Sequence, residues 1–457
     1  RVTPAEDGPP PEPFSLLGEA DRQRVAALDD VVDAYPMTSM QLAMVYHMEL
    51  EPERRPYHNV NSYRVATPLD EEALARVLTE AVERHPVLRT SLDLASFSEP
   101  MQLIHRAAPS PLTVEDIQGA DQQAAITALV EREWATPFDL RTAPLFRVTA
   151  QRLSPAAFQL TLTEHHAILD GWSFTSLVAE ILNRHALLRD HPETPQAPPP
   201  KSRFSRFVAL ERAAAGSADS VAFWKERLSG LDGTLFTGLG QTATVAHSID
   251  REVDGDLFRA MSRLAVTAGT SRKSVALTAH LIALGRVTGR TEVVTGLGVN
   301  GRVEEEAGTE ALGLFLNTVP FSVSLDGGTW IDLVRRVHQD ETAIMPHRRV
   351  PFATLARHMR DWNLDANFGF NRFHALAGVR IDDERIGCSP TMRYEPNHFT
   401  LSIGFVQDPA SDRALIIADY PASKLPHTVA ADYVDSFLRA AHAMTVQPYS
   451  NYREELR

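Results

Sequence analysis

The residues best suited to catalysis in this 457-residue chain lie together in the run EHHAILDG at positions 164–171. An imidazole with an unperturbed pKa of about 6.5 can accept a proton from an amine or a hydroxyl group during nucleophilic attack. Asp170 could hold the loop in place, and Gly171 would let a backbone or a substrate approach where a Cβ would obstruct it. This run is therefore the first candidate for a functional site.

A strand, a short loop and a helix are expected to position the run. Apolar residues alternate with polar ones over residues 158–163, which is typical of a half-buried strand. Apolar residues recur at helical spacing over residues 174–182, with Ser173 as the expected N-cap. Because adjacent strand residues point to opposite faces, His165 and His166 should diverge, with His166 on the face of Phe158 and Leu162.

Three interpretations of the histidine pair remain open at this point. Both rings could be satisfied polar residues at the end of a strand, which is the ordinary outcome for an arbitrary pair. A metal site is poorly supported, because the rings diverge and no further ligand has helpful spacing. In the third interpretation one of the two histidines is catalytic, its neighbour is structural and Asp170 locks the loop.

Composition excludes several classes of protein. The chain has 45 Lys and Arg against 59 Asp and Glu, and the resulting net charge of −14 argues against a nucleic-acid binder. No stretch approaches 18 uninterrupted apolar residues, so we expect no membrane-spanning helix. The single cysteine, Cys388, cannot form an internal disulfide, and a reducing, cytoplasmic setting is the default.

Two proline-rich stretches suggest the domain organisation. Residues 1–13 contain five prolines and read as a linker, and a second cluster lies at residues 192–200. Helical and strand patterns mix on both sides of that cluster, so the fold class is α/β or α+β. We predict an N-terminal lobe over residues 14–195 and a C-terminal lobe over residues 196–457.

A second motif invites a nucleotide-binding interpretation. Residues 296–301, GLGVNG, form a GxGxxG pattern after an expected strand, and Asp326 lies about where a ribose-binding acid could fall. That interpretation needs a helix packed on the sheet immediately afterwards. Residues 302–312, RVEEEAGTEAL, have little apolar face, so a glycine-rich strand end is the better account.

A family resemblance now narrows these alternatives. HHAILDGWS resembles the HHxxxDG signature of the condensation domains of nonribosomal peptide synthetases, which are related to chloramphenicol acetyltransferase. Further segments resemble the family's motifs in the family's order, and the resemblance extends from about residue 14 to residue 445. These segments are residues 35–47, 57–60, 84–90, 204–211, 313–320 and 347–352.

The resemblance implies a fold and a reaction. It implies an α/β protein of two chloramphenicol acetyltransferase-like lobes arranged as a V-shaped pseudo-dimer. Donor and acceptor peptidyl carrier proteins would deliver substrates on phosphopantetheine arms, with adjacent synthetase domains as further partners and no permanently bound cofactor or metal. The reaction would be amide formation, by attack of an acceptor amine on a donor acyl thioester.

Roles for individual residues follow from the same resemblance. His166 would act on the acceptor nucleophile as a base or by positioning it, with His165 in support, and the Gly171 N–H could stabilise the oxyanion. Asp170 would be structural and would pair with an arginine of the second lobe, for which Arg302 is the match. Asn371 is the best match for an asparagine that faces the active site.

Two rival functions stay open. A free-standing or chain-releasing relative would join a carrier-bound acyl group to a soluble amine or alcohol, forming an amide or an ester. A non-catalytic platform would bind carrier proteins and keep the histidine motif only as a remnant.

Overall fold

The computed structural model describes residues 11–50, 52–53, 55–232, 235–236, 246–304, 306–357, 364–372, 392–394, 397, 399–407 and 412–456. Cys388 and residues 1–10 of the predicted linker lie outside these ranges. The chain divides into two compact units, each made of three stretches of sequence. The first contains residues 1–213, 301–315 and 374–396, and the second contains residues 214–300, 316–373 and 397–457.

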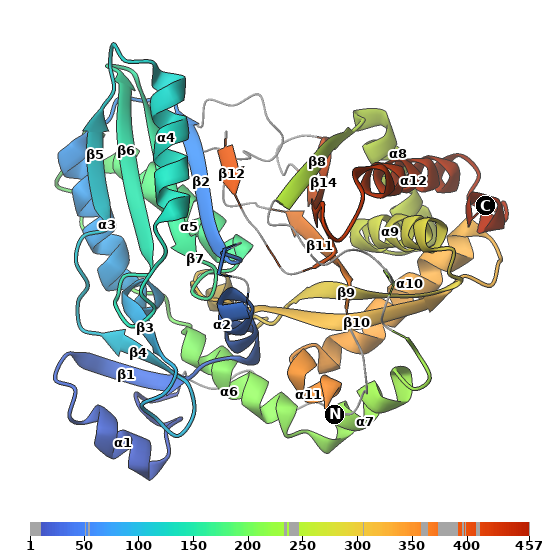
Figure 1. Cartoon of the computed structure of the whole chain (residues 1–457), viewed down its shortest axis with the longest axis horizontal. Coiled ribbons are helices and arrows are strands. Elements are labelled where there is room, and N and C mark those ends of the chain that lie inside the picture. Colours follow the sequence, from blue (N-terminus) through green and yellow to red (C-terminus); the bar gives the residue numbers. More distant parts are fainter. Residues whose placement is uncertain are drawn as a thin grey trace. The chain divides into compact units, whose positions relative to one another are not determined.

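A five-stranded sheet with helices on both faces forms the centre of the first unit (Figure 1). The strand order is β12-β2-β7-β6-β5, and neighbours are antiparallel except for the parallel pair β5 and β6. Helix α4 covers one face, and α3 and α5 cover the other. The bounds are β2 His58–Val65, β5 Leu112–Asp116, β6 Phe146–Ser154, β7 Ala157–His165, β12 Met392–Tyr394, α3 Glu71–Arg84, α4 Gln122–Ala135 and α5 Gly171–Asp190.

The predicted strand and helix around the histidine pair are both present. Strand β7 presents Phe158, Leu160 and Leu162 to the core formed with α3 and α5. The predicted N-cap of α5 is wrong, because Asp170 takes that place and accepts the Ser173 N–H at 2.7 Å. A carboxylate three residues ahead is a strong cap, and it leaves the Ser173 hydroxyl to bond elsewhere.

A smaller antiparallel sheet, of order β1-β4-β3, completes the first unit together with α1 and α2. Its core is a separate small cluster of apolar side chains that includes Leu17, Val25 and Met101. The bounds are β1 Val31–Pro36, β3 Thr90–Asp93, β4 Met101–His105, α1 Glu19–Val25 and α2 Ser39–Leu50.

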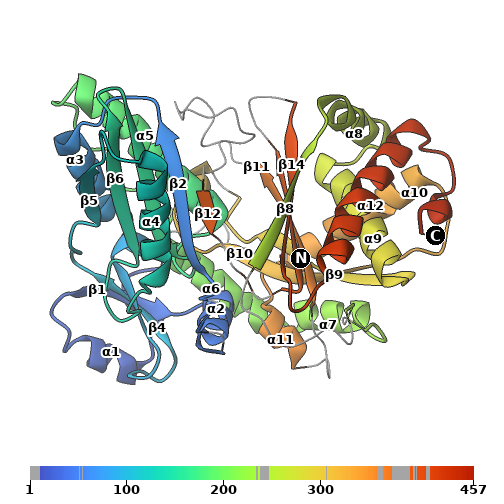
Figure 2. The same ribbon diagram turned by 45° about the horizontal axis from the view of Figure 1, so that its top comes forward.

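The second unit is a six-stranded sheet with four helices packed on one face, as Figures 1 and 2 show. The order is β10-β9-β11-β13-β14-β8, in which β11 is parallel to β9 and β13 and the other pairs are antiparallel. The bounds are β8 Ala246–Val253, β9 Glu292–Asn300, β10 Leu316–Ser324, β11 Ala366–Arg372, β13 Leu401–Gln407, β14 Ala414–Pro421, α8 Gly255–Ala268, α9 Arg272–Thr288, α10 Trp330–Ile344 and α12 His427–Val446.

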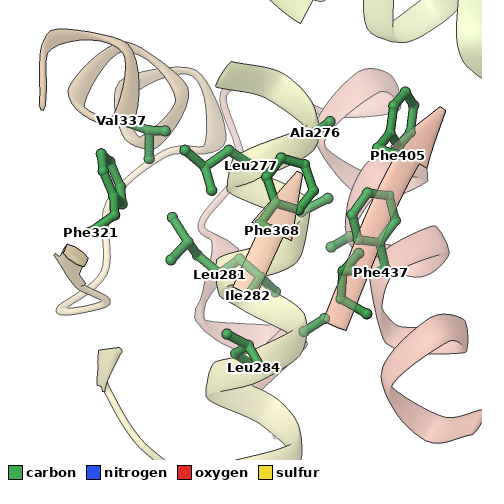
Figure 3. Close-up of a cluster of buried hydrophobic side chains, with 14 of the residues drawn as sticks. Ala276, Leu277, Leu281, Ile282, Leu284, Phe321, Val337, Phe368, Phe405 and Phe437 are labelled. Atoms are coloured by element: carbon green, nitrogen blue, oxygen red, sulfur yellow. The ribbon is translucent and has the colours of Figure 1, made fainter. Parts of the chain in front are cut away.

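Helix α9 is the centre of the second core (Figure 3). It is apolar on most of its surface, and Leu277, Leu281 and Leu284 are fully buried. Phe368 from β11 and Phe437 from α12 belong to the same cluster of side chains. A helix that is apolar nearly all round must be covered on several sides, which agrees with its place between the sheet and the other helices.

The compact units differ in their bounds from the predicted lobes. Residues 196–213 stay with the first unit, and helix α6, Phe204–Ala215, crosses the border. The proline cluster is held against α3 and α5 by arginines. From α3, Arg76 donates to the Thr194 carbonyl at 2.8 Å and Arg84 to the Pro198 carbonyl at 2.9 Å, and from α5 Arg184 donates to the Pro195 carbonyl at 2.8 Å. Residues 301–315 also join the first unit, although β9 and β10 on either side of them belong to the second.

Candidate active site

His165, the last residue of β7, is an enclosed and neutral histidine. It is 1% exposed, and burial lowers its pKa to about 3, with smaller contributions from His58 and His166. Its Nδ1 accepts the Ala167 N–H at 3.2 Å, so the ring hydrogen is on Nε2, which lies 3.3 Å from the Met48 sulfur. This ring is therefore enclosed by protein groups and has almost no contact with solvent.

His166 is the histidine of the pair that reaches solvent. Its side chain is 21% exposed. Its backbone N–H donates to the Tyr57 carbonyl at 2.8 Å, and its ring lies parallel to the Tyr57 ring, with centroids 6.4 Å apart and an interplanar angle of 4°. Tyr57 itself has a φ of 69°, in the left-handed region that non-glycine residues seldom adopt. Strained residues of this kind cluster at functional sites, which supports the choice of His166 over His165.

A buried carboxylate lies beside His166 that sequence reasoning gave no role. Glu164 Oε1 is 3.3 Å from His166 Nδ1 and accepts the Asn59 side-chain N–H at 2.8 Å. The Glu164 side chain is only 3% exposed. The sequence did contain a signal for this residue, because Glu164 is a charged side chain on the strand face that otherwise carries Phe158, Leu160 and Leu162.

Asp170 and Arg302 form the ion pair that the family resemblance implied. Arg302 Nη2 lies 3.1 Å from Asp170 Oδ1, and the side chains are 5% and 9% exposed. The Asp170 carboxylate also accepts the backbone N–H of Phe315 at 3.0 Å, in addition to capping α5. One difference from the expectation is that Arg302 lies in residues 301–315, which pack with the first unit.

The guanidinium of Arg302 is enclosed on several sides. It donates to the Ser173 hydroxyl and to the carbonyls of Gly308 and Ala311, and it lies 4.0 Å from the centre of the Phe315 ring. Burial lowers its pKa, and the neighbouring Asp170 carboxylate acts in the opposite direction. Because so many groups converge on it, Arg302 joins residues 301–315 to the start of α5.

Two glycines let residues 301–315 pack tightly. A Cβ at Gly301 would lie 2.4 Å from Phe207, and a Cβ at Gly313 would lie 2.4 Å from Phe204. Both phenylalanines belong to α6. The described part of residues 301–315 contains a short 3-10 turn, Glu306–Thr309, and leads into β10, which pairs antiparallel with β9. The GxGxxG pattern therefore serves packing, and the helix that a dinucleotide site would need is not found among these described residues.

Gly171 and Asn371 are the remaining predicted site residues. Gly171 is the first residue of α5, so its N–H is among the helix N-terminal groups that have no partner within the helix. Asn371 lies in β11 of the second unit. Among the described residues, no group of three or more His, Cys, Asp or Glu side chains could hold a metal ion. The helices described are also too short or too polar to cross a membrane.

Comparison with known proteins assigns the family. The model of the condensation domain matches residues 31–376, so the chain belongs to the condensation-domain family. The resemblance to the condensation domains of nonribosomal peptide synthetases is confirmed, and so is the mixed α/β fold. These domains are acyltransferase-type enzymes that form amide bonds.

Three relatives illustrate the match. The AMB antimetabolite synthetase AmbE of Pseudomonas aeruginosa is 39% identical over 381 residues, or 81% of this chain and 18% of the relative. Gramicidin S synthase 2 of Brevibacillus brevis is 25% identical over 341 residues, or 72% of this chain and 8% of the relative. The first condensation domain of the calcium-dependent antibiotic synthetase shares the fold, with a TM-score of 0.75 at 18% identity, covering 92% of this chain and 98% of that one. The chain thus spans less than a fifth of the length of either of these two synthetases.

Proposed function

We propose that this domain joins a donor acyl thioester to an acceptor amine, with both substrates carried on phosphopantetheine arms of carrier proteins. The observation that carries the proposal is His166: a partly exposed imidazole at the end of β7, fixed by the Tyr57 carbonyl and the Glu164 carboxylate. A mutant of the starter condensation domain of rhizomide synthetase, which shares this fold, has been crystallised with C8-CoA and Leu-SNAC. The donor and acceptor carrier proteins and the adjacent synthetase domains are the partners that this reaction requires.

The reaction needs one group that exchanges protons. The amine nitrogen attacks the thioester carbonyl carbon, and His166 accepts the proton that the nitrogen loses as the C–N bond forms. The tetrahedral intermediate then expels the pantetheine thiolate, which takes the proton back from the imidazolium. The N–H of Gly171, at the N-terminus of α5, is the proposed donor to the oxyanion.

Intact-mass measurement of both carriers tests the proposal. A donor carrier loaded with a panel of acyl groups is mixed with an acceptor carrier loaded with a panel of amino acids. The acceptor carrier should gain the acyl mass, and His166→Ala should lower kcat/KM by about 10²- to 10⁴-fold. His165→Gln tests the enclosed neighbour and should affect folding more than chemistry.

The other outcomes separate the rival functions. Product released into solution in the presence of free amines or alcohols would instead support a chain-releasing enzyme. A non-catalytic platform for carrier proteins would show no turnover with any acceptor. Its affinity for the carrier proteins would be the same in the wild type and in His166→Ala. Full activity of His166→Ala would refute the role given to this residue.

A further inference from the structure

Glu164 is a carboxylate where the strand pattern calls for an apolar side chain. Phe158, Leu160 and Leu162 lie on one face of β7 and are at most 2% exposed. Glu164 comes next on that face and is equally enclosed. A buried carboxylate is costly unless polar groups compensate for the lost water, so its surroundings should reveal why it is there.

Two side chains converge on the same oxygen of this carboxylate. Asn59 lies directly opposite Glu164 in the pairing of β2 with β7, and its Nδ2 donates to Oε1 at 2.8 Å. His166 Nδ1 lies 3.3 Å from Oε1. Asn59 therefore anchors the carboxylate from the neighbouring strand, and the carboxylate in turn contacts the imidazole.

We infer that Glu164 is a positioning residue that holds His166 in the tautomer protonated at Nδ1. An ionised carboxylate can only accept hydrogen bonds, so the hydrogen between the two groups belongs to Nδ1. The lone pair of the neutral ring is then on Nε2, which is the atom that receives the proton of the attacking amine. The catalytic consequence rests on the proposed function, whereas the tautomer itself does not.

The neighbouring histidine provides an internal contrast. His165 accepts the Ala167 N–H at Nδ1, so its hydrogen is on Nε2. Two consecutive histidines are thus held in opposite tautomers, one by a backbone N–H and the other by a carboxylate. A packing role for Glu164 would not require this arrangement, because leucine would continue the row of β7 at no electrostatic cost.

Nitrogen-15 NMR of the imidazoles tests the tautomer directly. The protein is labelled at histidine, and the His165 and His166 signals are assigned by their loss in His165→Gln and His166→Ala. In the wild type, His166 should show hydrogen on Nδ1 and His165 should show hydrogen on Nε2. In Glu164→Leu the His166 signals should shift toward a mixture of tautomers, while those of His165 stay in place.

Steady-state kinetics with the carrier-bound substrates tests the consequence. Glu164→Leu should lower kcat about 10- to 100-fold and change KM less than threefold. This decrease in activity should be smaller than the one caused by His166→Ala. Glu164→Gln keeps an oxygen that can accept from Asn59 and His166, so it should retain the Nδ1 tautomer and recover part of kcat. Thr163→Val is the matched control, because Thr163 is equally buried but bonds Glu133 on the opposite face of β7.

Several results would overturn the inference. One is a His166 that stays protonated at Nδ1 in Glu164→Leu, and another is an unchanged kcat in that variant. A third is a kcat that falls only in proportion to the folded fraction, since that indicates a structural role. If the tautomer shifts as expected but His166→Ala stays active, the inference on Glu164 holds and the proposed function of His166 fails.

Discussion

Replacing Asp170 with asparagine should destabilise the domain through the charge that it leaves on Arg302. Asparagine is as good an N-cap as aspartate, so the cap of α5 is kept and the Ser173 N–H retains an acceptor. What disappears is the negative charge opposite a guanidinium that is 5% exposed. Breaking a buried ion pair from one side costs about 3–5 kcal/mol.

The structure indicates where in that range the cost should fall. Arg302 keeps its bonds to the carbonyls of Gly308 and Ala311 and its contact with the Phe315 ring, so Asp170→Asn should cost about 3 kcal/mol. Asp170→Ala also removes the cap, which adds about 1 kcal/mol. Against a typical total stability of about 5–15 kcal/mol, either change should reduce the yield of soluble protein and the activity.

Urea denaturation followed by circular dichroism measures the effect. Asp121→Asn is the matched control, because Asp121 caps α4 by accepting the Ala124 N–H at 3.1 Å but is exposed, and it should change stability by less than about 0.5 kcal/mol. Arg302→Met in the Asp170→Asn background should recover part of the loss, since the lone buried charge is gone. A cost below about 1 kcal/mol for Asp170→Asn, or purely additive effects in the double variant, would refute the reasoning.

Two further predictions concern the stability of the first unit, to which Glu211 and Gly301 belong. Burial raises the pKa of Glu211 to about 7, so the folded state holds its proton more tightly and stability should fall as the pH rises from about 4.5 through about 7. The advantage of Glu211→Gln over the wild type should therefore grow by about 2–3 kcal/mol between pH 5 and pH 8 in urea titrations, and a constant difference would contradict the prediction. Gly301→Ala would bring a Cβ to 2.4 Å from Phe207 and should cost about 1–3 kcal/mol by thermal unfolding. Gly404→Ala, whose nearest contact would be Ile417 at 3.7 Å, is the control, and equal effects of the two would contradict the packing argument.

Much of the fold could be predicted because periodicity is a local property. The alternation in residues 158–163 predicted β7, and the helical spacing of residues 174–182 predicted α5. The predicted N-cap of α5 was wrong because Asp170 and Ser173 are both good capping residues. Sequence alone does not rank two candidates that lie three positions apart. The bounds of the units could not be predicted either, since they depend on long-range contacts such as those of Arg76 with the proline cluster.

The residues of the site that belong to a sequence signature could be predicted. The role of a residue that depends on strand pairing could not. His166 and Asp170 belong to one short motif, and Arg302 follows from the resemblance. The role of Glu164 depends on Asn59, which is 105 residues away in sequence but lies opposite it in the sheet. No local pattern specifies which residue of β2 faces a given residue of β7, because register is set by the packing of the whole sheet.

Two sets of interactions of different kinds hold His166, one on the strand and one on the helix. Variants of the two sets should therefore differ in how they lose activity. On the strand side, Glu164 and the Tyr57 carbonyl act on the ring and its backbone. On the helix side, the Asp170 and Arg302 pair fixes the start of α5 four residues later. A variant on the helix side should lose activity in proportion to the folded protein that it loses. A variant of Glu164 should lose activity per folded molecule, because the His166 ring loses the carboxylate that fixes its tautomer. Activity normalised to the folded fraction is therefore the quantity that distinguishes a residue that builds this site from one that tunes its chemistry.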